Sequence, residues 1–186
     1  MGEEVKDLES VKELISILET LPSVGKKSAA RIAYEIAKDK VKGLRILDAI
    51  ENVVSNVREC SKCGSLSEYE VCSICDSNRD KVVAVVENSK DIGIIEESGS
   101  FGGYYFVFDD NVEKLREFIL DKDIKEVIFA FSPSVENEIK MQKIKEELEL
   151  DVKYYSIAKG VPMGVSLENV DVSSINFAFL GKILLD

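Results

Sequence analysis

Four cysteines form a C-x2-C-x8-C-x2-C array, and this array constrains the fold more than any other feature of the sequence. They are Cys60, Cys63, Cys72 and Cys75, the only cysteines in 186 residues, and the chain contains no histidine. Two close pairs separated by a short loop can supply four thiolates to one tetrahedral Zn²⁺ ion. Because four ligands leave no open coordination position, we expect one structural zinc ion per chain. Two disulfides, or four free thiols, are the alternatives.

Charge is distributed unevenly along the chain. The whole sequence carries a net charge of −11, which argues against a uniformly basic nucleic-acid-binding protein. Residues 21–45, however, contain seven Lys or Arg against two acidic residues, a local charge of +5. A phosphate-contacting surface has this character, but so does a solvated helical face. Charge alone leaves both interpretations open.

The N-terminus lacks the charged-then-apolar pattern of an export signal, and no apolar run is long enough for a membrane span. We therefore expect a cytoplasmic protein without a membrane partner. Thiols stay reduced in that compartment, which favours zinc over disulfides. The length and the 45% apolar content suffice for a core in one domain or two small ones.

The first part of the chain has helical periodicity. Apolar residues recur at helical spacing over residues 8–20, and proline and glycine then break the pattern within 21–25. A second helix is expected over 26–38 and a third over 44–57, leading into the cysteine array.

After the cysteine array, strand and helix patterns alternate. Residues 81–87 are almost all apolar, as in a strand that is buried on both faces of a parallel sheet. The later segments continue the alternation: helices at 89–97, 111–121 and 135–149, and strands at 104–108, 125–131 and 152–157. This order predicts a parallel sheet with helices on its faces. An apolar helix expected over 175–185 would dock on this domain or on another subunit.

The segment L-P-S-V-G-K-K-S-A-A-R between the first two helices predicts a helix–hairpin–helix motif that contacts the DNA backbone. A turn containing Gly25 lets backbone N–H groups face outward beside the positive end of the second helix, where they can bind a phosphate. Lys27 and Arg31 are four residues apart and share a helical face, so they can contact neighbouring phosphates. Lys26 is a third candidate contact. An ordinary helical hairpin with solvated basic residues is the alternative.

The order of these motifs resembles the RecR family of bacterial recombination mediator proteins. Besides the hairpin and the cysteine array, the matching segments are V-A-V-V-E-N-S-K-D, G-S-F-G-G-Y-Y-F-V-F, F-S-P-S-V-E-N-E and A-K-G-V-P-M-G. The resemblance implies an α+β multi-module fold: a helix–hairpin–helix DNA-binding region (1–57), a four-cysteine zinc finger (58–78), a Toprim α/β domain with a parallel sheet (79–171) and a short helical C-terminal tail (172–186). The usual hairpin pattern has glycine where this chain has Ser23.

The resemblance also implies a function. Members of the family form rings, typically tetramers, that can encircle DNA. They act with RecO, and in many bacteria with RecF, to load RecA onto gapped single-stranded DNA. By this resemblance Lys27 and Arg31 take DNA-contact positions, and the four cysteines take the zinc positions. We expect a homo-oligomer, a ring tetramer or a dimer, that binds single- or double-stranded DNA with little sequence preference.

Catalytic Toprim domains bind Mg²⁺ through a Glu after the first strand and an Asp-x-Asp after a later one. This chain has Glu87 at the first position but Ser132-Pro133-Ser134 at the second. Serine hydroxyls are poor Mg²⁺ ligands, so we expect a protein without nuclease or topoisomerase activity. Glu136 and Glu138 retain some acidity and could support residual metal or partner binding. A Mg²⁺-dependent Toprim nuclease or primase-like enzyme remains the alternative, and a protein–protein adaptor is a third hypothesis.

The connection after the second predicted strand is shorter than is usual in the family. Asp109 and Asp110 lead almost directly into the next helix, and we expect Asn111 to cap that helix rather than the two aspartates to replace the missing metal ligands. The glycines at 99, 102 and 103 lack a following Gly-Lys-Ser/Thr, so we expect turn glycines and no P-loop.

Overall fold

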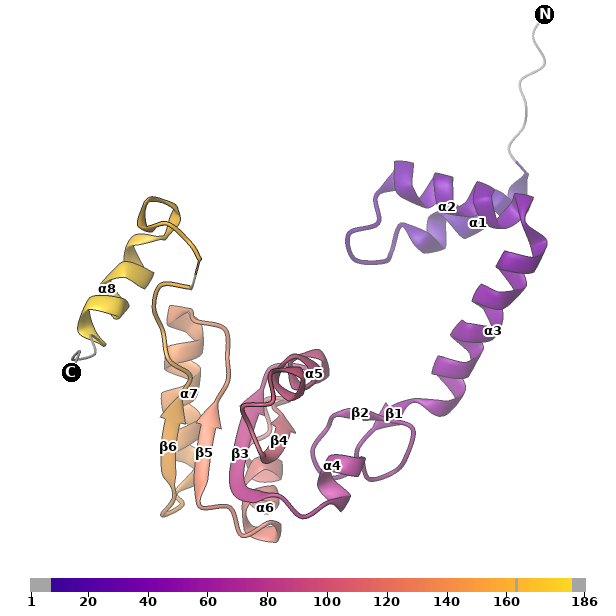
Figure 1. Cartoon of the computed structure of the whole chain (residues 1–186). Helices are drawn as coiled ribbons and strands as arrows, with labels where there is room; N and C mark the ends of the chain where they lie inside the picture. The colour runs from indigo at the N-terminus through magenta and orange to yellow at the C-terminus, as the bar shows by residue number, and fades with distance from the viewer. Residues whose placement is uncertain (1–7, 163, 182–186) are drawn as a thin grey trace, which may run out of the picture. The chain divides into compact units, whose positions relative to one another are not determined.

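The computed structural model describes residues 8–162 and 164–181, which fall into two compact units that meet between Val57 and Arg58 (Figure 1). The first unit consists of helices only. The second contains the cysteine array, a four-stranded sheet and the C-terminal helix.

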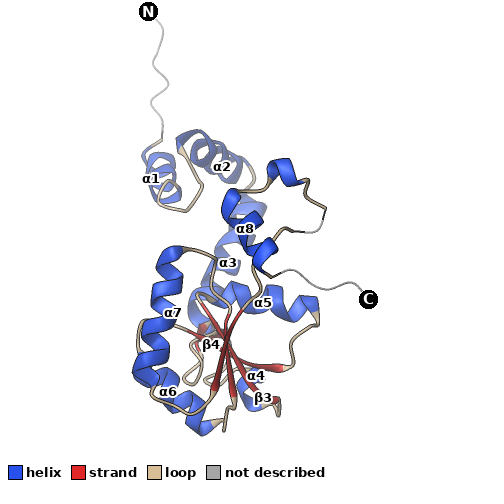
Figure 2. Cartoon of the chain, turned by 90° about the vertical axis from the view of Figure 1, so that its left-hand side faces the viewer, coloured by secondary structure: helices blue, strands red, loops and turns tan. Residues whose placement is uncertain are grey.

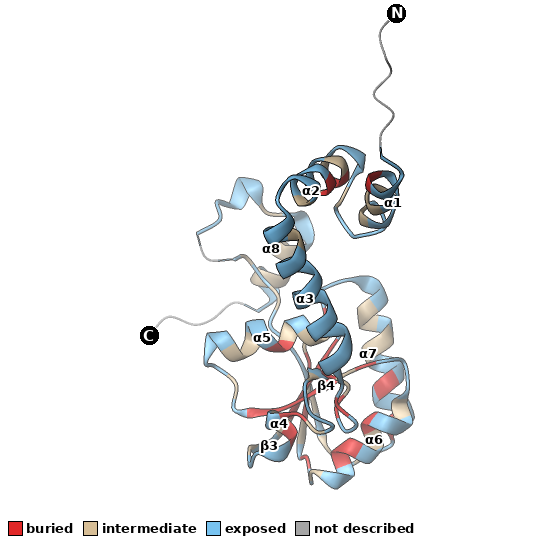
Figure 3. Cartoon of the chain, turned by 90° about the vertical axis from the view of Figure 1, so that its right-hand side faces the viewer, coloured by how far each residue is buried: buried red, intermediate tan, exposed pale blue. Residues whose placement is uncertain are grey.

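The first unit contains helices α1 (Glu9–Leu18), α2 (Lys26–Lys38) and α3 (Lys40–Asn56). Helices α1 and α2 pack together through Val11, Ala29 and Ala33, the buried residues in the described part of this unit (Figure 3). The two alanines have small side chains, which allow the helices to approach closely. The predicted pair of helices joined by a hairpin is therefore confirmed.

The hairpin between α1 and α2 turns through a left-handed residue. Ser23 has a φ of 63°, the conformation that glycine adopts most easily. A side chain in this region costs on the order of 1 kcal/mol. Ser23 thus keeps the turn of the usual hairpin pattern in spite of the missing glycine.

Helix α3 begins at Lys40, four residues before the predicted start. The Asp39 side chain accepts a hydrogen bond from the Lys42 backbone N–H at 3.0 Å, which makes Asp39 the N-cap of the helix. No residue of α3 is buried. Its large apolar side chains are exposed instead: Val41, Leu44, Ile46, Leu47, Ile50, Val53 and Val54.

The cysteine array folds into short elements that the sequence did not predict. Strands β1 (Arg58–Glu59) and β2 (Leu66–Ser67) form an antiparallel pair, and the one-turn helix α4 (Ser73–Asp76) carries the last cysteine. All four cysteines are buried and belong to the same apolar core as the main sheet.

The main sheet is parallel and has the strand order β4-β3-β5-β6. Its strands are β3 (Asp80–Val86), β4 (Gly103–Val107), β5 (Glu126–Phe129) and β6 (Lys153–Ser156). Helix α5 (Ser89–Ser98) lies on one face, and α6 (Val112–Asp121) and α7 (Val135–Leu148) lie on the other (Figure 2). The predicted alternation of strands and helices is confirmed.

Both faces of β3 are buried, as its apolar run predicted. Val83 and Val85 pack in the core beneath α6 and α7, whereas Ala84 and Val86 pack on the α5 side. The backbones of β3 and β4 approach closely at Gly103. A Cβ atom at this position would lie only 2.3 Å from the Val82 carbonyl oxygen, so a larger residue would not fit. Gly99 ends α5 with a φ of 63°. These glycines therefore serve the turn into β4, as predicted.

The chain ends in a 3-10 turn (Leu167–Asn169) and helix α8 (Val172–Leu180). Helix α8 starts three residues before the predicted 175, because Asp171 caps it by accepting the Ser174 N–H at 2.9 Å. The predicted end at 185 lies outside the described residues. Within the described ranges, no helix has the length and apolar character needed to cross a membrane.

Candidate zinc and DNA-binding sites

The four cysteine sulfurs converge on one point. All four Sγ atoms lie within 4.8 Å of one another, and those of Cys63 and Cys72 are 3.6 Å apart. Four thiolates about 2.3 Å from a tetrahedral Zn²⁺ ion have sulfur–sulfur distances of about 3.8 Å. None of the four cysteines is in a disulfide. The spacing therefore fits a zinc ion and does not support the disulfide alternative.

Hydrogen bonds reach the sulfurs from the backbone and from the other cysteines, and they favour the thiolate form at Cys63. The Cys72 N–H donates to the Cys60 sulfur at 3.3 Å, and the Cys75 N–H donates to the Cys72 sulfur at 3.4 Å. A hydrogen bond from the Cys75 thiol lowers the pKa of Cys63 to about 5. The same bond raises the pKa of Cys75, because removing its proton would place a second negative charge beside the first. A divalent cation relieves this repulsion.

The cysteine array docks on one edge of the main sheet. The Val107 N–H in β4 donates to the Cys63 carbonyl at 2.8 Å, and Lys122 Nζ donates to the Cys75 carbonyl at 2.6 Å. An ion pair between Lys62 and Asp121, with 2.7 Å between nitrogen and oxygen, adds a contact to α6. The array therefore covers the β4 edge, which would otherwise present unpaired backbone groups.

Arg79, in the segment between the cysteine array and β3, forms an ion pair with Glu96 of α5. Its guanidinium binds both oxygens of Glu96 at 2.7 and 2.8 Å, and Tyr105 Oη donates to Glu96 at 2.7 Å. The Arg79 hydrogen bonds, followed by the one from Tyr105, lower the pKa of Glu96 to about 2. Glu96 therefore stays ionised at neutral pH and holds α5 against both partners.

The candidate DNA-contact residues surround the start of α2. Gly25 is the N-cap, with no side chain capping the helix among the described residues, and the space around its Cα is open. Lys26, Lys27 and Arg31 are exposed and form no ion pair within the described part of the chain. The positive end of α2 and three uncompensated cations thus share one surface, an arrangement that suits a phosphate.

Glu87 lies directly after β3, where Toprim enzymes place their first metal ligand. Its carboxylate accepts the Ser132 N–H at 2.8 Å and a hydrogen bond from Asn137 Nδ2 at 3.1 Å. The Ser132 N–H is the main cause of its lowered pKa. Each oxygen of Glu87 thus has a neutral donor within the protein. Asn137 was not identified from the sequence, where no pattern links it to Glu87.

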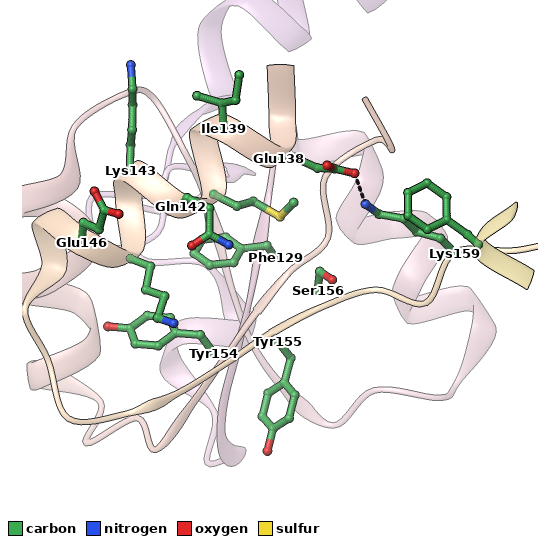
Figure 4. A pocket seen from close by; sticks show the side chains of 13 residues that line it. Phe129, Glu138, Ile139, Gln142, Lys143, Glu146, Tyr154, Tyr155, Ser156 and Lys159 are labelled. Carbon is green, nitrogen blue, oxygen red and sulfur yellow. Dashed lines mark hydrogen bonds and ion pairs between the residues drawn. The ribbon is translucent and has the colours of Figure 1, made fainter. Parts of the chain in front are cut away.

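The other acidic candidates lie elsewhere. Glu138 pairs with Lys159 at a hollow of about 690 Å³ between α7, β6 and α8 (Figure 4). Glu136 lines a different hollow, beside Lys140 and Phe108. Among the described residues, the cysteines are the one group of three or more ligand side chains that could hold a metal ion. Glu87, Glu136 and Glu138 do not form such a group.

The residues before α6 have the structural role that the sequence predicted. Asn111 caps α6 by accepting the Lys114 N–H at 3.2 Å. Asp109 pairs with Lys114 at 2.6 Å, and Asp110 pairs with Lys140 at 2.7 Å. The two aspartates are therefore held by lysines rather than grouped with Glu87.

A helix–hairpin–helix, a four-cysteine metal knuckle and a Toprim-like parallel sheet define a class of multi-module DNA-recombination proteins. Family models for the RecR helix-hairpin-helix and the RecR four-cysteine zinc finger domain match residues 11–54 and 57–77. The recombination protein RecR of Nitratiruptor sp. is 42% identical over 184 residues, covering 95% of this chain and 97% of the relative. RecR of Campylobacter jejuni (strain 81-176) is 40% identical over 94% of this chain and 96% of its own length. RecR of Helicobacter pylori (strain G27) is 37% identical over 91% and 92%.

The chain belongs to the RecR family of recombination proteins.

Proposed function

We propose that this protein is a non-catalytic mediator of recombinational DNA repair in the cytoplasm. It binds DNA through Gly25, Lys26, Lys27 and Arg31 and acts with RecO, and with RecF where present, to load RecA onto gapped single-stranded DNA. The observation that carries the proposal is a group of exposed cations at the start of α2, which have no ion-pair partner among the described residues. Family membership supports the role in recombination. Residues 1–57, 58–78, 79–171 and 172–186 then serve as the DNA-binding region, zinc finger, Toprim domain and tail.

The cofactor in this proposal is one structural Zn²⁺ ion per chain, held by Cys60, Cys63, Cys72 and Cys75. The clustering of four sulfurs within 4.8 Å supports the assignment. Zinc is d¹⁰ and redox-inactive, and four thiolates close its coordination shell. The ion would therefore fix the docking of the array on β4 and α6 and take part in no reaction.

The absence of catalysis is proposed from the surroundings of Glu87. A Mg²⁺ ion needs several hard oxygen ligands in near-octahedral geometry. Here the two oxygens of Glu87 accept hydrogen bonds from Ser132 and Asn137, and neither serine flanking Pro133 supplies an anionic ligand. This arrangement supports a structural or partner-binding role for Glu87.

A homo-oligomer, a ring tetramer or a dimer, is supported by the surface of α3. Seven large apolar side chains of this helix are exposed, which is unusual for a helix that remains in water. Covering them with another copy of the chain would bury apolar area and bring basic hairpins of several copies together. An acidic chain could then present a basic lining to DNA.

The proposed function is tested by fluorescence anisotropy with duplex and gapped DNA across a salt series. The wild type should bind with affinity that falls steeply with salt, and Lys27→Ala/Arg31→Ala should weaken binding and flatten the salt dependence. Lys90→Ala/Lys143→Ala removes the same charge from exposed positions of the second unit and is the matched control. Equal binding by the two double variants would place the DNA site elsewhere. No binding by the wild type, even at low salt, would contradict the proposal.

A further inference from the structure

We propose that Tyr34 and Lys38 extend the hairpin site along α2 into a track for single-stranded DNA, in which the Tyr34 ring stacks on an unpaired base. This inference rests on the proposed function, because it assumes that DNA reaches Lys27 and Arg31. It adds a contact that discriminates single strands from duplexes, which the phosphate contacts of the hairpin do not provide.

The four side chains lie on one face of α2. With 3.6 residues per turn, positions 27, 31, 34 and 38 fall within a sector of about 60° around the helix axis. The buried alanines, Ala29 and Ala33, which contact α1, point to the opposite side. The track (Lys27, Arg31, Tyr34 and Lys38) therefore faces away from the core of the first unit and extends about 16 Å along the helix.

Exposure and charge fit a nucleic-acid surface. All four residues of the track are exposed, and Tyr34 is 52% accessible. The acidic residue of α2, Glu35, is paired with Lys42 at 3.1 Å and is therefore neutralised beside the track. Lys38 forms no ion pair with any residue that the structure describes. The track thus presents three cations with an aromatic ring between them.

An aromatic ring between cations matches what single strands offer. Proteins that bind single strands combine a basic path for the backbone with aromatic rings that stack on successive bases. In a duplex the bases are already stacked and paired, so a ring on the protein surface cannot reach their faces. Stacking on Tyr34 would therefore favour the unpaired region of a gapped substrate without reading its sequence.

Three variants of the full chain test the track: Tyr34→Ala, Tyr34→Phe and Lys38→Ala. The control Tyr69→Ala removes a tyrosine that is 72% exposed in the cysteine array. Binding is measured by anisotropy with a single strand of mixed sequence and with a duplex of the same length. Tyr34→Ala should weaken single-strand binding by about 10-fold and leave duplex binding nearly unchanged, because one stacking contact is lost. Tyr34→Phe and Tyr69→Ala should bind both probes as the wild type does.

Lys38→Ala should weaken binding to both the single strand and the duplex and make its salt dependence shallower, since the change removes one phosphate contact. The track is wrong if Tyr34→Ala binds the single strand as the wild type does, or if Tyr34→Phe binds it as weakly as Tyr34→Ala. A fall in oligomer mass for Tyr34→Ala, measured by light scattering, would assign Tyr34 to a protein interface and also overturn the track. Loss of binding in Lys27→Ala/Arg31→Ala together with an unchanged Tyr34→Ala would reject the track and keep the proposed function. No binding by the wild type rejects both.

Discussion

The two units of this chain are stabilised in different ways. In the first, the described residues bury Val11 and two alanines, and α3 buries nothing. The second buries apolar side chains on both faces of a sheet and draws its four cysteines into the same core. The second unit therefore has an interior of its own, whereas the first keeps its charged and apolar side chains on surfaces that other molecules can contact.

This difference fits the different tasks proposed for the two units. In the proposed function, a helical hairpin with a small core presents α2 and α3 to DNA and to other copies of the chain. The sheet and the cysteine array supply a rigid body. Changes in the second unit should therefore affect stability, and changes in the first should mainly affect binding.

Loss of the metal should have the largest effect. Cys72→Ser removes one of four thiolates, and structural zinc contributes on the order of 10 kcal/mol to folding of small zinc domains. We expect zinc content, measured by atomic emission, to fall from about one ion per chain. The second unit should lose several kcal/mol of stability in thermal unfolding followed by circular dichroism. Ser73→Ala, at the adjacent exposed position, is the control. A wild type that is fully folded without metal would refute the zinc assignment.

One apolar deletion in each unit tests whether the two units differ in what stabilises them. Phe118 is 3% exposed and contacts the rings of Tyr104 and Phe106, so Phe118→Ala should cost about 3–5 kcal/mol in denaturant unfolding. Ile50 on α3 is 57% exposed, so Ile50→Ala should cost the single chain less than about 1 kcal/mol. Its effect should appear as weaker self-association in analytical ultracentrifugation. Similar losses of stability in both variants would remove the distinction between the units.

The Glu96 ion pair predicts a pH-dependent contribution to the second unit. The folded pKa of about 2 lies below the ordinary value of 4.5. Ionised Glu96 therefore contributes stability above pH 4.5 and loses it as the pH falls through 2. Glu96→Gln should cost about 1–2 kcal/mol at neutral pH, since solvent screens a side chain that is 35% exposed.

The measurement for Glu96 is urea unfolding of both proteins between neutral and acidic pH. The difference in free energy of unfolding should shrink as the pH falls below 4.5. A difference that stays constant over this range would show that the carboxylate charge contributes nothing.

The smallest expected effect is in the hairpin. Ser23→Gly should stabilise the first unit by about 1 kcal/mol, because glycine adopts the left-handed conformation at φ 63° without strain. Ser28→Gly, within α2, should instead destabilise it by about 0.5 kcal/mol. Amide hydrogen exchange of α1 and α2 in the whole chain can follow both changes. A destabilising Ser23→Gly would mean that the serine hydroxyl is needed in the turn.

The sequence predicted the features that depend on local pattern. The apolar run of β3, the hairpin breakers and the paired cysteines each specify their structure within a few residues. The start of α3 was missed although Asp39 is a recognisable N-cap, because the apolar pattern alone placed the start at 44.

Features that depend on residues far apart in sequence could not be predicted. The docking of Cys63 on Val107 and the hydrogen bonds from Ser132 and Asn137 to Glu87 join segments that only the folded sheet brings together. The exposure of α3 is also a property of the fold, since its apolar pattern is equally typical of a buried helix. Asn137 is thus visible as a partner of Glu87 only in the structure.

The most direct test of the account is hydrogen–deuterium exchange of the full chain with and without gapped DNA, in the presence of Mg²⁺. The account predicts slower exchange on DNA binding in residues 20–38, which contain the hairpin and α2, with the segments around Glu87 and Ser132 unchanged and the DNA uncut. Protection confined to the segments around Glu87 and Ser132, or cleavage of the DNA, would contradict it and support a Toprim enzyme.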